Sequence, residues 1–309
     1  MPFTKIAPAE VVQMRQFNKK LAWMPRFKIR NRVTPRVIQA LLRMSQLGGD
    51  KQLARHGLTA ETRVIKVDGV AVPLRIIRPL GEIKGLVLDF HGGGWVIGNA
   101  QMDDAFNLAM VKACNVATVS VDYRLAVSTP IAQLMNDCLG AARWLLGNEC
   151  EEFAGLPVIV VGESAGAHLA AATLLALKAW PTMLRRVSGA VLYYGVYDLT
   201  GTPSVRTAGP ETLLLDGPGM VEALRRQYPQ RQMLRSQDRV MTRPTQEIAI
   251  GHTAIPDFYT APQRAYTGQC GAAKHVCGQD ALELGIHFAK YFAQPVALGR
   301  HAVEHFSQR

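Results

Sequence analysis

Residues 156–179 read LPVIVVGESAGAHLAAATLLALKA, and this stretch decides the fold. The apolar run Leu156–Val161 predicts a buried strand, and the Ala- and Leu-rich run Ala165–Ala179 predicts a helix. Between them lies Gly162-Glu163-Ser164-Ala165-Gly166, a G-x-S-x-G pattern. A strand, a sharp turn that carries a serine, and a helix are the parts of a nucleophile elbow. We therefore expect Ser164 to be held in a strained turn, with its hydroxyl at the positive end of the helix.

A second motif, His91-Gly92-Gly93-Gly94-Trp95, follows directly after the apolar run Gly85–Phe90. Three successive glycines leave the main chain bare, so its N–H groups can turn toward a bound oxygen. Acyl transfer builds negative charge on a carbonyl oxygen, and aimed amides stabilise that charge. We expect an oxyanion hole made by the amides of Gly93, Gly94 and Ala165, with His91 shaping the loop. The glycine spacing does not match phosphate-binding loops.

Short apolar runs alternate with helical patterns through the middle of the chain. This alternation predicts βαβ units and a largely parallel sheet, which is an α/β fold. The first two strands are joined at Asp68-Gly69, a hairpin signal. The predicted strands are 61–67, 70–77, 85–90, 116–121, 156–161 and 187–194, and the clearest predicted helices are 131–146 and 165–179.

The N-terminal region is basic and apolar at once. Residues 11–49 hold nine Lys or Arg and no acidic residue, and apolar residues recur there at helical spacing. The pattern predicts two amphipathic helices, and the second of them starts at Thr34-Pro35 and stops at Gly48-Gly49, which are helix start and stop signals. One interpretation is a helical cap whose apolar side covers the main domain. Another is contact with anionic lipid headgroups, with Trp23 and Phe27 dipping in. Nucleic-acid binding lacks a recognised motif here, and no such partner is expected.

Composition narrows the class of protein. The chain has 309 residues, of which 48% are hydrophobic and 19% charged, so it forms a folded core of one large domain or two small ones. No apolar run is long enough to span a bilayer, and no secretory signal pattern opens the chain. Five cysteines, an odd number, favour reduced thiols in the cytoplasm. Cys270, His275 and Cys277 lack the paired spacing of a zinc site, so no metal is expected. The net charge of +11 favours anionic partners.

The order and spacing of HGGGW, Asp122-Tyr123-Arg124-Leu125-Ala126 and GESAG resemble the bacterial hormone-sensitive lipase family of α/β-hydrolases, the α/β-hydrolase-3 carboxylesterases, over about residues 60–200. The resemblance implies an α/β-hydrolase fold with an eight-stranded, mostly parallel central sheet, flanking helices and a helical N-terminal cap. It implies short- to medium-chain carboxylic esters as substrates, no cofactor, and Ser164 as nucleophile. The chain departs from the family pattern at Val127-Ser128, at Glu163 and at Ala167-His168.

A serine nucleophile needs a histidine base and an orienting carboxylate, which follow in the order Ser, Asp, His in this fold. Asp257 and His287 match the family's separation best, and Phe288 follows as the pattern suggests. We therefore predict Ser164, Asp257 and His287 as the triad. The other downstream candidates are Asp198, Asp216, Asp238, Asp280, His252, His275, His301 and His305.

The expected domains are a cap at 1–58 and a catalytic domain at 59–309, with a cap excursion near 199–226. Residues 227–279 are atypical, because they hold eight Gln and few large apolar residues. Translation of this segment out of frame is one explanation. The expected function is a serine carboxylesterase, with a small-molecule ester as partner and a homodimer left open. The alternative is a catalytically weak or inactive homologue that binds a ligand on the same scaffold.

Overall fold

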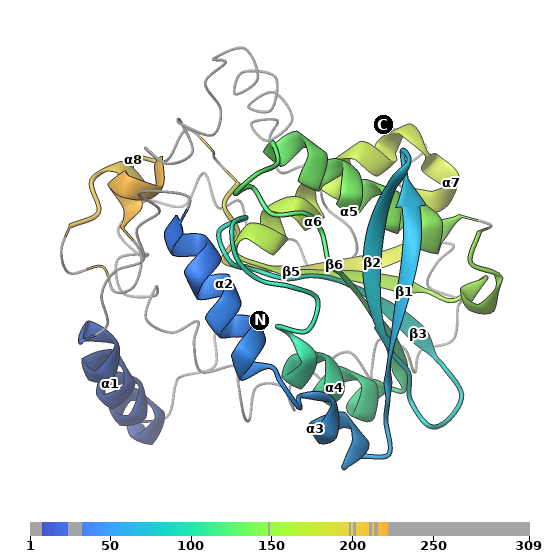
Figure 1. Cartoon of the computed structure of the whole chain (residues 1–309), viewed down its shortest axis with the longest axis horizontal. Coiled ribbons are helices and arrows are strands. Elements are labelled where there is room, and N and C mark those ends of the chain that lie inside the picture. Colours follow the sequence, from blue (N-terminus) through green and yellow to red (C-terminus); the bar gives the residue numbers. More distant parts are fainter. Residues whose placement is uncertain are drawn as a thin grey trace.

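A computed structural model describes residues 8–23, 33–147, 149–197, 199, 202–209, 212 and 216–221. These residues form a six-stranded sheet with helices packed on both of its faces (Figure 1). The strands are β1 (Ala60–Val67), β2 (Val70–Ile77), β3 (Gly85–Phe90), β4 (Val116–Val121), β5 (Val158–Glu163) and β6 (Val187–Tyr193). The α-helices are α1 (Pro8–Ala22), α2 (Val33–Ser45), α3 (Asp50–Ala54), α4 (Asp104–Cys114), α5 (Ile131–Leu146), α6 (Ala165–Ala176), α7 (Pro181–Leu184) and α8 (Pro203–Arg206), with 3₁₀ turns at Glu151–Phe153 and Leu177–Ala179.

The strand order is β1-β2-β4-β3-β5-β6, with β1, β2 and β4 paired antiparallel and β4, β3, β5 and β6 paired parallel. The hairpin between β1 and β2 turns at Asp68 and Gly69, whose φ angles of 50° and 80° suit a two-residue hairpin turn. The expected α/β class and mostly parallel sheet are confirmed. The described residues contain six strands, where the resemblance implies eight for the whole chain.

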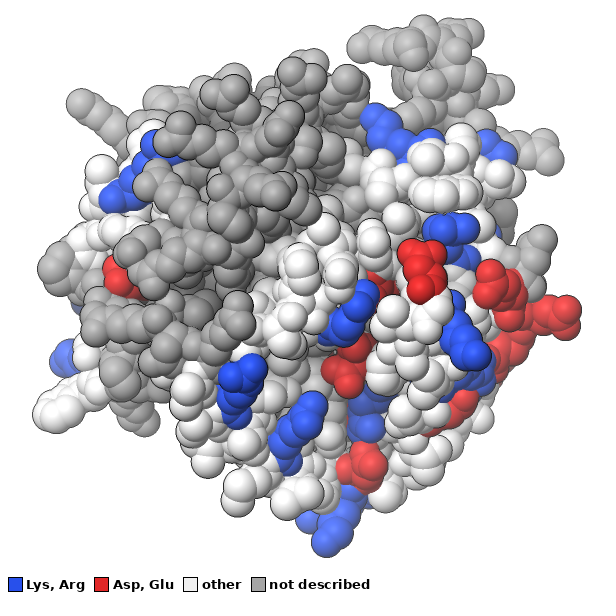
Figure 2. All heavy atoms as spheres, turned by 45° about the horizontal axis from the view of Figure 1, so that its top comes forward, with Lys and Arg blue, Asp and Glu red and all other residues white. Residues whose placement is uncertain are grey.

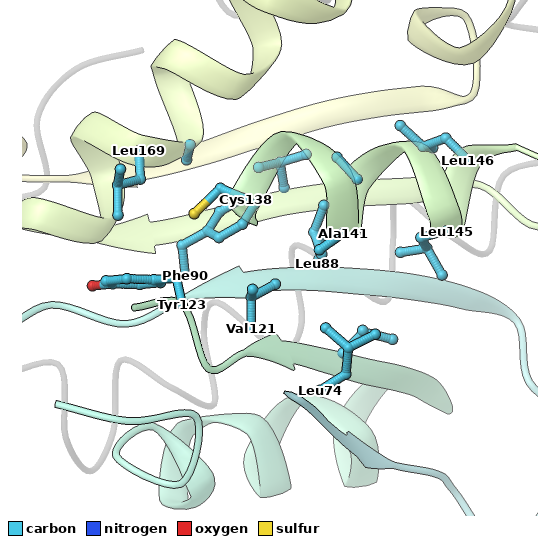
Figure 3. Close-up of a cluster of buried hydrophobic side chains, with 14 of the residues drawn as sticks. Leu74, Leu88, Phe90, Val121, Tyr123, Cys138, Ala141, Leu145, Leu146 and Leu169 are labelled. Atoms are coloured by element: carbon cyan, nitrogen blue, oxygen red, sulfur yellow. The ribbon is translucent and has the colours of Figure 1, made fainter. Parts of the chain in front are cut away.

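The two faces of the sheet carry separate apolar clusters. Leu88 and Phe90 of β3 belong to the larger cluster, which α5 and α6 cover (Figure 3). Val87, the residue before Leu88, faces the other side and packs with Met110 of α4 and Ile159 of β5. This alternation follows from the two-residue period of a strand. Because both faces are covered, the central strands consist of apolar runs rather than alternating patterns.

Several element bounds differ from the sequence-based expectation, and two of the differences have a clear physical reason. Strand β5 begins at Val158 and not at Leu156, because Pro157 has no N–H to give to a ladder. Helix α4 is absent from the expected elements, although its buried residues recur at helical spacing. Those residues are Asn107, Leu108, Met110, Val111 and Cys114. A polar residue, Asn107, lies in the middle of this apolar face and weakens the pattern.

The segment after α2 is built into the body of the molecule. Leu53 of α3 and Leu58 are 1% and 4% exposed, and they pack with Ile77, Leu108 and Val111. The end of the expected 1–58 cap therefore shares a core with β2 and α4. Among the described helices, none combines the length and apolar character that a bilayer crossing requires.

Candidate active site

Ser164 sits on the turn between β5 and α6 in an unusual backbone conformation. Its φ and ψ angles are 51° and −115°, and its amide donates a 2.8 Å hydrogen bond to the carbonyl of Tyr193. A non-glycine residue in this region stores strain of about 1–3 kcal/mol, which the surrounding structure must hold. The Ser164 residue is partly exposed, whereas Ala165 and Gly166 after it are buried. The strand–turn–helix arrangement predicted from the motif is the one observed.

Close packing explains the two flanking glycines. A Cβ on Gly166 would lie 1.8 Å from the carbonyl oxygen of Phe90 and 2.5 Å from that of His91. A Cβ on Gly162 would lie 2.5 Å from the carbonyl oxygen of Gly166. Since real Cβ atoms never come so close to backbone, only glycine lets the end of β3 reach the first turn of α6.

The triple-glycine loop leaves the sheet beside the elbow. Strands β3 and β5 are parallel neighbours with Phe90 opposite Gly162, so both turns follow strand ends at the same sheet edge. Gly93, Gly94 and Trp95 have φ angles of 107°, 59° and 64°, which turn the main chain sharply. The loop closes on itself, because the amides of Val96 and Ile97 both donate to the carbonyl of Gly93.

The amides expected to form the oxyanion hole lie in these two adjacent turns. Among the described residues, none accepts a hydrogen bond from the backbone amides of Gly93, Gly94 or Ala165. Backbone N–H groups are obligatory donors, so amides that have no acceptor among the described residues can donate to water or to a ligand. The roles of Gly93, Gly94, Ala165 and Ser164 stay predictions.

His91 is fixed inside the loop. Its ring stacks on Tyr123 at a centroid distance of 4.1 Å, and its Nδ1 lies 2.8 Å from the carbonyl oxygen of Gly92. The Tyr123 hydroxyl donates a 2.6 Å hydrogen bond to the His91 carbonyl. Burial lowers the pKa of His91 to about 4, so the ring is neutral at pH 7. These contacts fit the expected loop-shaping role, and they give Tyr123 of the DYRLA motif a structural purpose.

Trp95 and His168 join the two motifs across 73 residues. The Trp95 Nε1–H donates to His168 Nδ1 at 3.3 Å, and the rings meet edge to face at 5.4 Å. Both residues are buried, and burial lowers the pKa of His168 to about 4. His168 departs from the family pattern, and sequence reasoning assigned it no role. The sequence signal that could have indicated a structural role for His168 was its position in the first turn of a helix predicted to be buried.

A buried carboxyl lies beneath the same loop. Asp89 of β3 accepts hydrogen bonds from Asn107 at 3.0 Å and from Ser120 at 2.8 Å. Burial is the largest influence on it and raises its pKa to about 6, with the nearby Glu163 charge acting in the same direction. Glu163 itself accepts a hydrogen bond from the hydroxyl of Tyr194. Of these groups Glu163 lies beside the glycine loop, since a Cβ on Gly92 would come within 2.8 Å of its Oε1.

The predicted triad partners Asp257 and His287 lie outside the described residues. Among the residues that the structure describes, no histidine side chain hydrogen-bonds the Ser164 hydroxyl; the one histidine contact is the backbone amide of His168, which donates to the Ser164 carbonyl at 3.2 Å. The described part of the chain also holds no group of three His, Cys, Asp or Glu side chains placed to bind a metal. A cavity of about 600 Å³ lies between Leu146, Cys150 and Trp180, near the start of β5. Ligands of parallel sheets bind at the carboxyl ends of the strands, so this cavity lies away from the sheet edge that carries Ser164 and the glycine loop.

Comparison with known families matches the alpha/beta hydrolase fold model to residues 87–257, which is more than half of the chain. The chain belongs to this family. The match takes in both glycine motifs and the helix between β4 and β5, and it confirms the resemblance to hormone-sensitive lipase-like α/β-hydrolases.

Several curated relatives of this α/β-hydrolase are named as esterases. It is 36% identical over 115 residues to an arylesterase of Saccharolobus solfataricus, across 36% of this chain and 37% of the relative. It is 33% identical over 137 residues to the carboxylesterase NlhH of Mycobacterium tuberculosis, across 43% of this chain and 42% of the relative. The chain thus aligns with less than half the length of these relatives.

Solved structures of esterases match a larger share of this chain than the curated sequences do. A hyperthermophilic esterase from Pyrobaculum calidifontis superposes with a TM-score of 0.59 and 26% identity, covering 76% of this chain and 74% of its own. The esterase LipW of Mycobacterium marinum superposes with a TM-score of 0.55 and 28% identity, covering 64% and 63%. The structural likeness therefore extends well beyond the segments of high sequence identity.

Proposed function

We propose that this α/β-hydrolase is a serine carboxylesterase that hydrolyses small-molecule esters with short- to medium-chain acyl groups. One observation carries the proposal: a strained, partly exposed Ser164 stands on an elbow beside a bare glycine loop whose amides have no described acceptor. The esterase names of the aligned relatives support the same class of reaction.

The reaction runs through an acyl-enzyme. The Oγ of Ser164 attacks the ester carbonyl while His287 takes the hydroxyl proton, and Asp257 orients the imidazole. The carbonyl oxygen becomes negative and accepts hydrogen bonds from the amides of Gly93, Gly94 and Ala165. The intermediate collapses, and the alcohol leaves with the proton held by the histidine. Water then attacks the acyl-enzyme in the same way, releasing the acid and restoring the serine.

The elbow helix α6 stabilises negative charge at the expected position of the oxyanion. Ala165 is the first residue of α6, so its N–H points out of the helix N-terminus, where the peptide dipoles favour negative charge. Each oxyanion donor of this kind is worth about 10²–10³ in rate. The glycine loop and α6 therefore supply charge stabilisation from main chain alone, with no cofactor.

Hydrolysis of p-nitrophenyl acetate and butyrate tests the nucleophile. We expect the parent to hydrolyse both esters, and Ser164→Ala to lower kcat/KM by about 10³-fold or more, because the acyl-enzyme can no longer form. Ser128→Ala, at an exposed serine, is the matched control and should keep parental rates. Equal rates for the parent and Ser164→Ala would overturn the serine mechanism.

A fluorophosphonate probe tests the base separately, because it reports covalent capture of an activated serine. His287→Ala and Asp257→Asn should slow labelling of Ser164 by about 10³-fold or more, since the hydroxyl loses its proton acceptor. His275→Ala and Asp238→Asn are matched controls from the same region and should label normally. Full labelling of His287→Ala would assign the base to another histidine. A parent that fails to label would instead favour the non-catalytic ligand-binding homologue.

A further inference from the structure

Helix α2 carries large apolar side chains on the side that faces away from the molecule. Val37, Leu41 and Met44 recur at spacings of four and three residues, so they lie on one helix face, and Leu47 continues the row in the turn that follows. Their exposed fractions are 53%, 60%, 64% and 80%. We name these four residues the α2 stripe. Scattered exposed apolar residues are normal, but a continuous row on one helix face marks an interaction surface.

The opposite face of α2 is fixed to the body of the molecule. The Gln39 side chain both donates to the Gly98 carbonyl at 2.9 Å and accepts from its amide at 2.7 Å. The side-chain amides of Gln46 and Asn99 exchange two further hydrogen bonds of 3.0 and 2.7 Å. Turning the stripe inward would break all four bonds. The α2 stripe is therefore held in place as a preformed outward surface.

Charge selects among the partners that could cover this surface. Arg36 and Arg43 are exposed on α2 beside the stripe, and the helix contains no acidic residue. A second copy of the chain would bring like charges together at the contact, with no carboxylate on the helix to pair them. An anionic surface would gain from the same arginines. This asymmetry favours lipid headgroups over self-association.

We propose that the α2 stripe docks this chain on an anionic lipid surface. Leu41 and Met44 enter the boundary between headgroups and acyl chains, while Arg36 and Arg43 stay at headgroup level, as in helices that lie in the plane of a membrane. Helix α2 has 13 residues and is about 20 Å long, so it lies on the surface and does not cross it. Because the opposite face of α2 is bonded to Gly98 and Asn99, docking would place α2 between the lipid and the segment that follows the glycine loop. The proposal stands independently of ester hydrolysis.

Vesicle co-sedimentation of the full chain tests the docking. One set of vesicles contains equal parts of phosphatidylglycerol and phosphatidylcholine, and the other contains phosphatidylcholine alone. We expect the chain to bind the anionic vesicles preferentially and to release at 1 M salt, where the Debye length falls to about 3 Å. Leu41→Asp and Met44→Asp should each weaken binding about tenfold, since a charge replaces buried apolar surface. Arg36→Gln and Arg43→Gln should each weaken it about fivefold.

Leu80→Asp is the matched control, because Leu80 is 78% exposed, lies next to Gly57 and is not part of α2, and receives the same substitution and charge change. It should bind anionic vesicles like the parent. Circular dichroism of each variant checks folding, which substitutions at exposed positions should leave intact. Equal binding of Leu41→Asp and Leu80→Asp would overturn the proposal. So would a concentration-dependent dimer that Leu41→Asp dissociates, because the stripe would then be a contact between copies.

Discussion

At Gly166 the absence of a side chain decides whether strand and helix can meet. The carbonyl oxygens of Phe90 and His91 occupy the space that a Cβ would need. We expect Gly166→Ala to lower the free energy of unfolding by about 1–3 kcal/mol or more, because backbone on both sides must shift. Gly189→Ala in β6 is the control, since a Cβ there meets nothing within 4 Å. Urea denaturation measures both. A Gly166→Ala variant as stable as Gly189→Ala would show that the elbow tolerates a wider turn.

A second residue-scale prediction concerns His168 and acid. Its pKa is lowered to about 4 by burial, while an unfolded histidine titrates near 6.5. The unfolded chain therefore takes up the proton first, so stability is fully present above pH 6.5 and falls as the pH drops toward 4. His168→Asn removes this contribution and should flatten the loss of stability between pH 6.5 and 4.

Urea denaturation across that pH range measures the effect. His91 carries a similar lowered pKa and keeps part of the slope in both proteins. The raised pKa of Asp89 has the opposite sign and is also common to both, so the difference isolates His168. His56→Asn, at an exposed histidine, should retain the parental slope. A parental slope in His168→Asn would mean that the buried ring does not remain neutral.

At the scale of elements, amide side chains join α2 to Gly98 and Asn99, in the segment that follows the glycine loop. The Gly98 amide donates to Gln39 Oε1, so it is protected from exchange only while α2 stays in place. We expect Gln39→Ala to speed hydrogen exchange at Gly98 by about tenfold, because removing one such hydrogen bond costs on the order of 1 kcal/mol or more. Gln52→Ala, on the exposed side of α3, serves as the control. Unchanged exchange at Gly98 would mean that the loop holds its own shape.

Element-scale prediction from sequence succeeded where the signal was local. Strand β5 and helix α6 follow from an apolar run, two glycines and an alanine-rich stretch that are neighbours in the chain. Helix α4 was not predicted, because Asn107 interrupts its apolar face. In the structure the side-chain Nδ2 of Asn107 donates to Asp89 and Ser120, which come from two different strands. No pattern confined to one helix could indicate those partners.

At the scale of the molecule, the N-terminal segment is tied to the main core. Leu53 is 1% exposed among Ile77, Leu108 and Val111, whereas Leu47, six residues earlier, is 80% exposed. Leu53→Ala should lower the free energy of unfolding by about 2–5 kcal/mol, because it opens a cavity in a shared core. Leu47→Ala should change it by less than about 0.5 kcal/mol. Guanidinium unfolding followed by fluorescence compares the two. Similar small effects would mean that α3 folds apart from the sheet.

An ion-paired arginine ties the same parts together. Arg75 on β2 pairs with Asp104 of α4 at 2.7 Å and with Asp50 of α3. A second group of ion pairs lies at β1. Arg63 of β1 and Arg78, which follows β2, each pair with the carboxylates of both Glu61 and Glu152. The face in Figure 2 accordingly shows basic and acidic side chains interspersed. Much of the net positive charge instead comes from residues 11–49, which contain no acidic residue.

The amino-acid sequence by itself determined the α/β class, the elbow around Ser164, the glycine loop and the basic N-terminal helices. These features depend on strand and helix periods and on glycine spacing, which act over a few residues. The triad partners Asp257 and His287 stay predictions, because sequence spacing alone supports them. The tertiary structure decided the contacts of Trp95 with His168, of Tyr123 with His91, and of α2 with the segment that follows the glycine loop. Those contacts join residues 32 to 73 positions apart, and only packing of the sheet brings such distant side chains together.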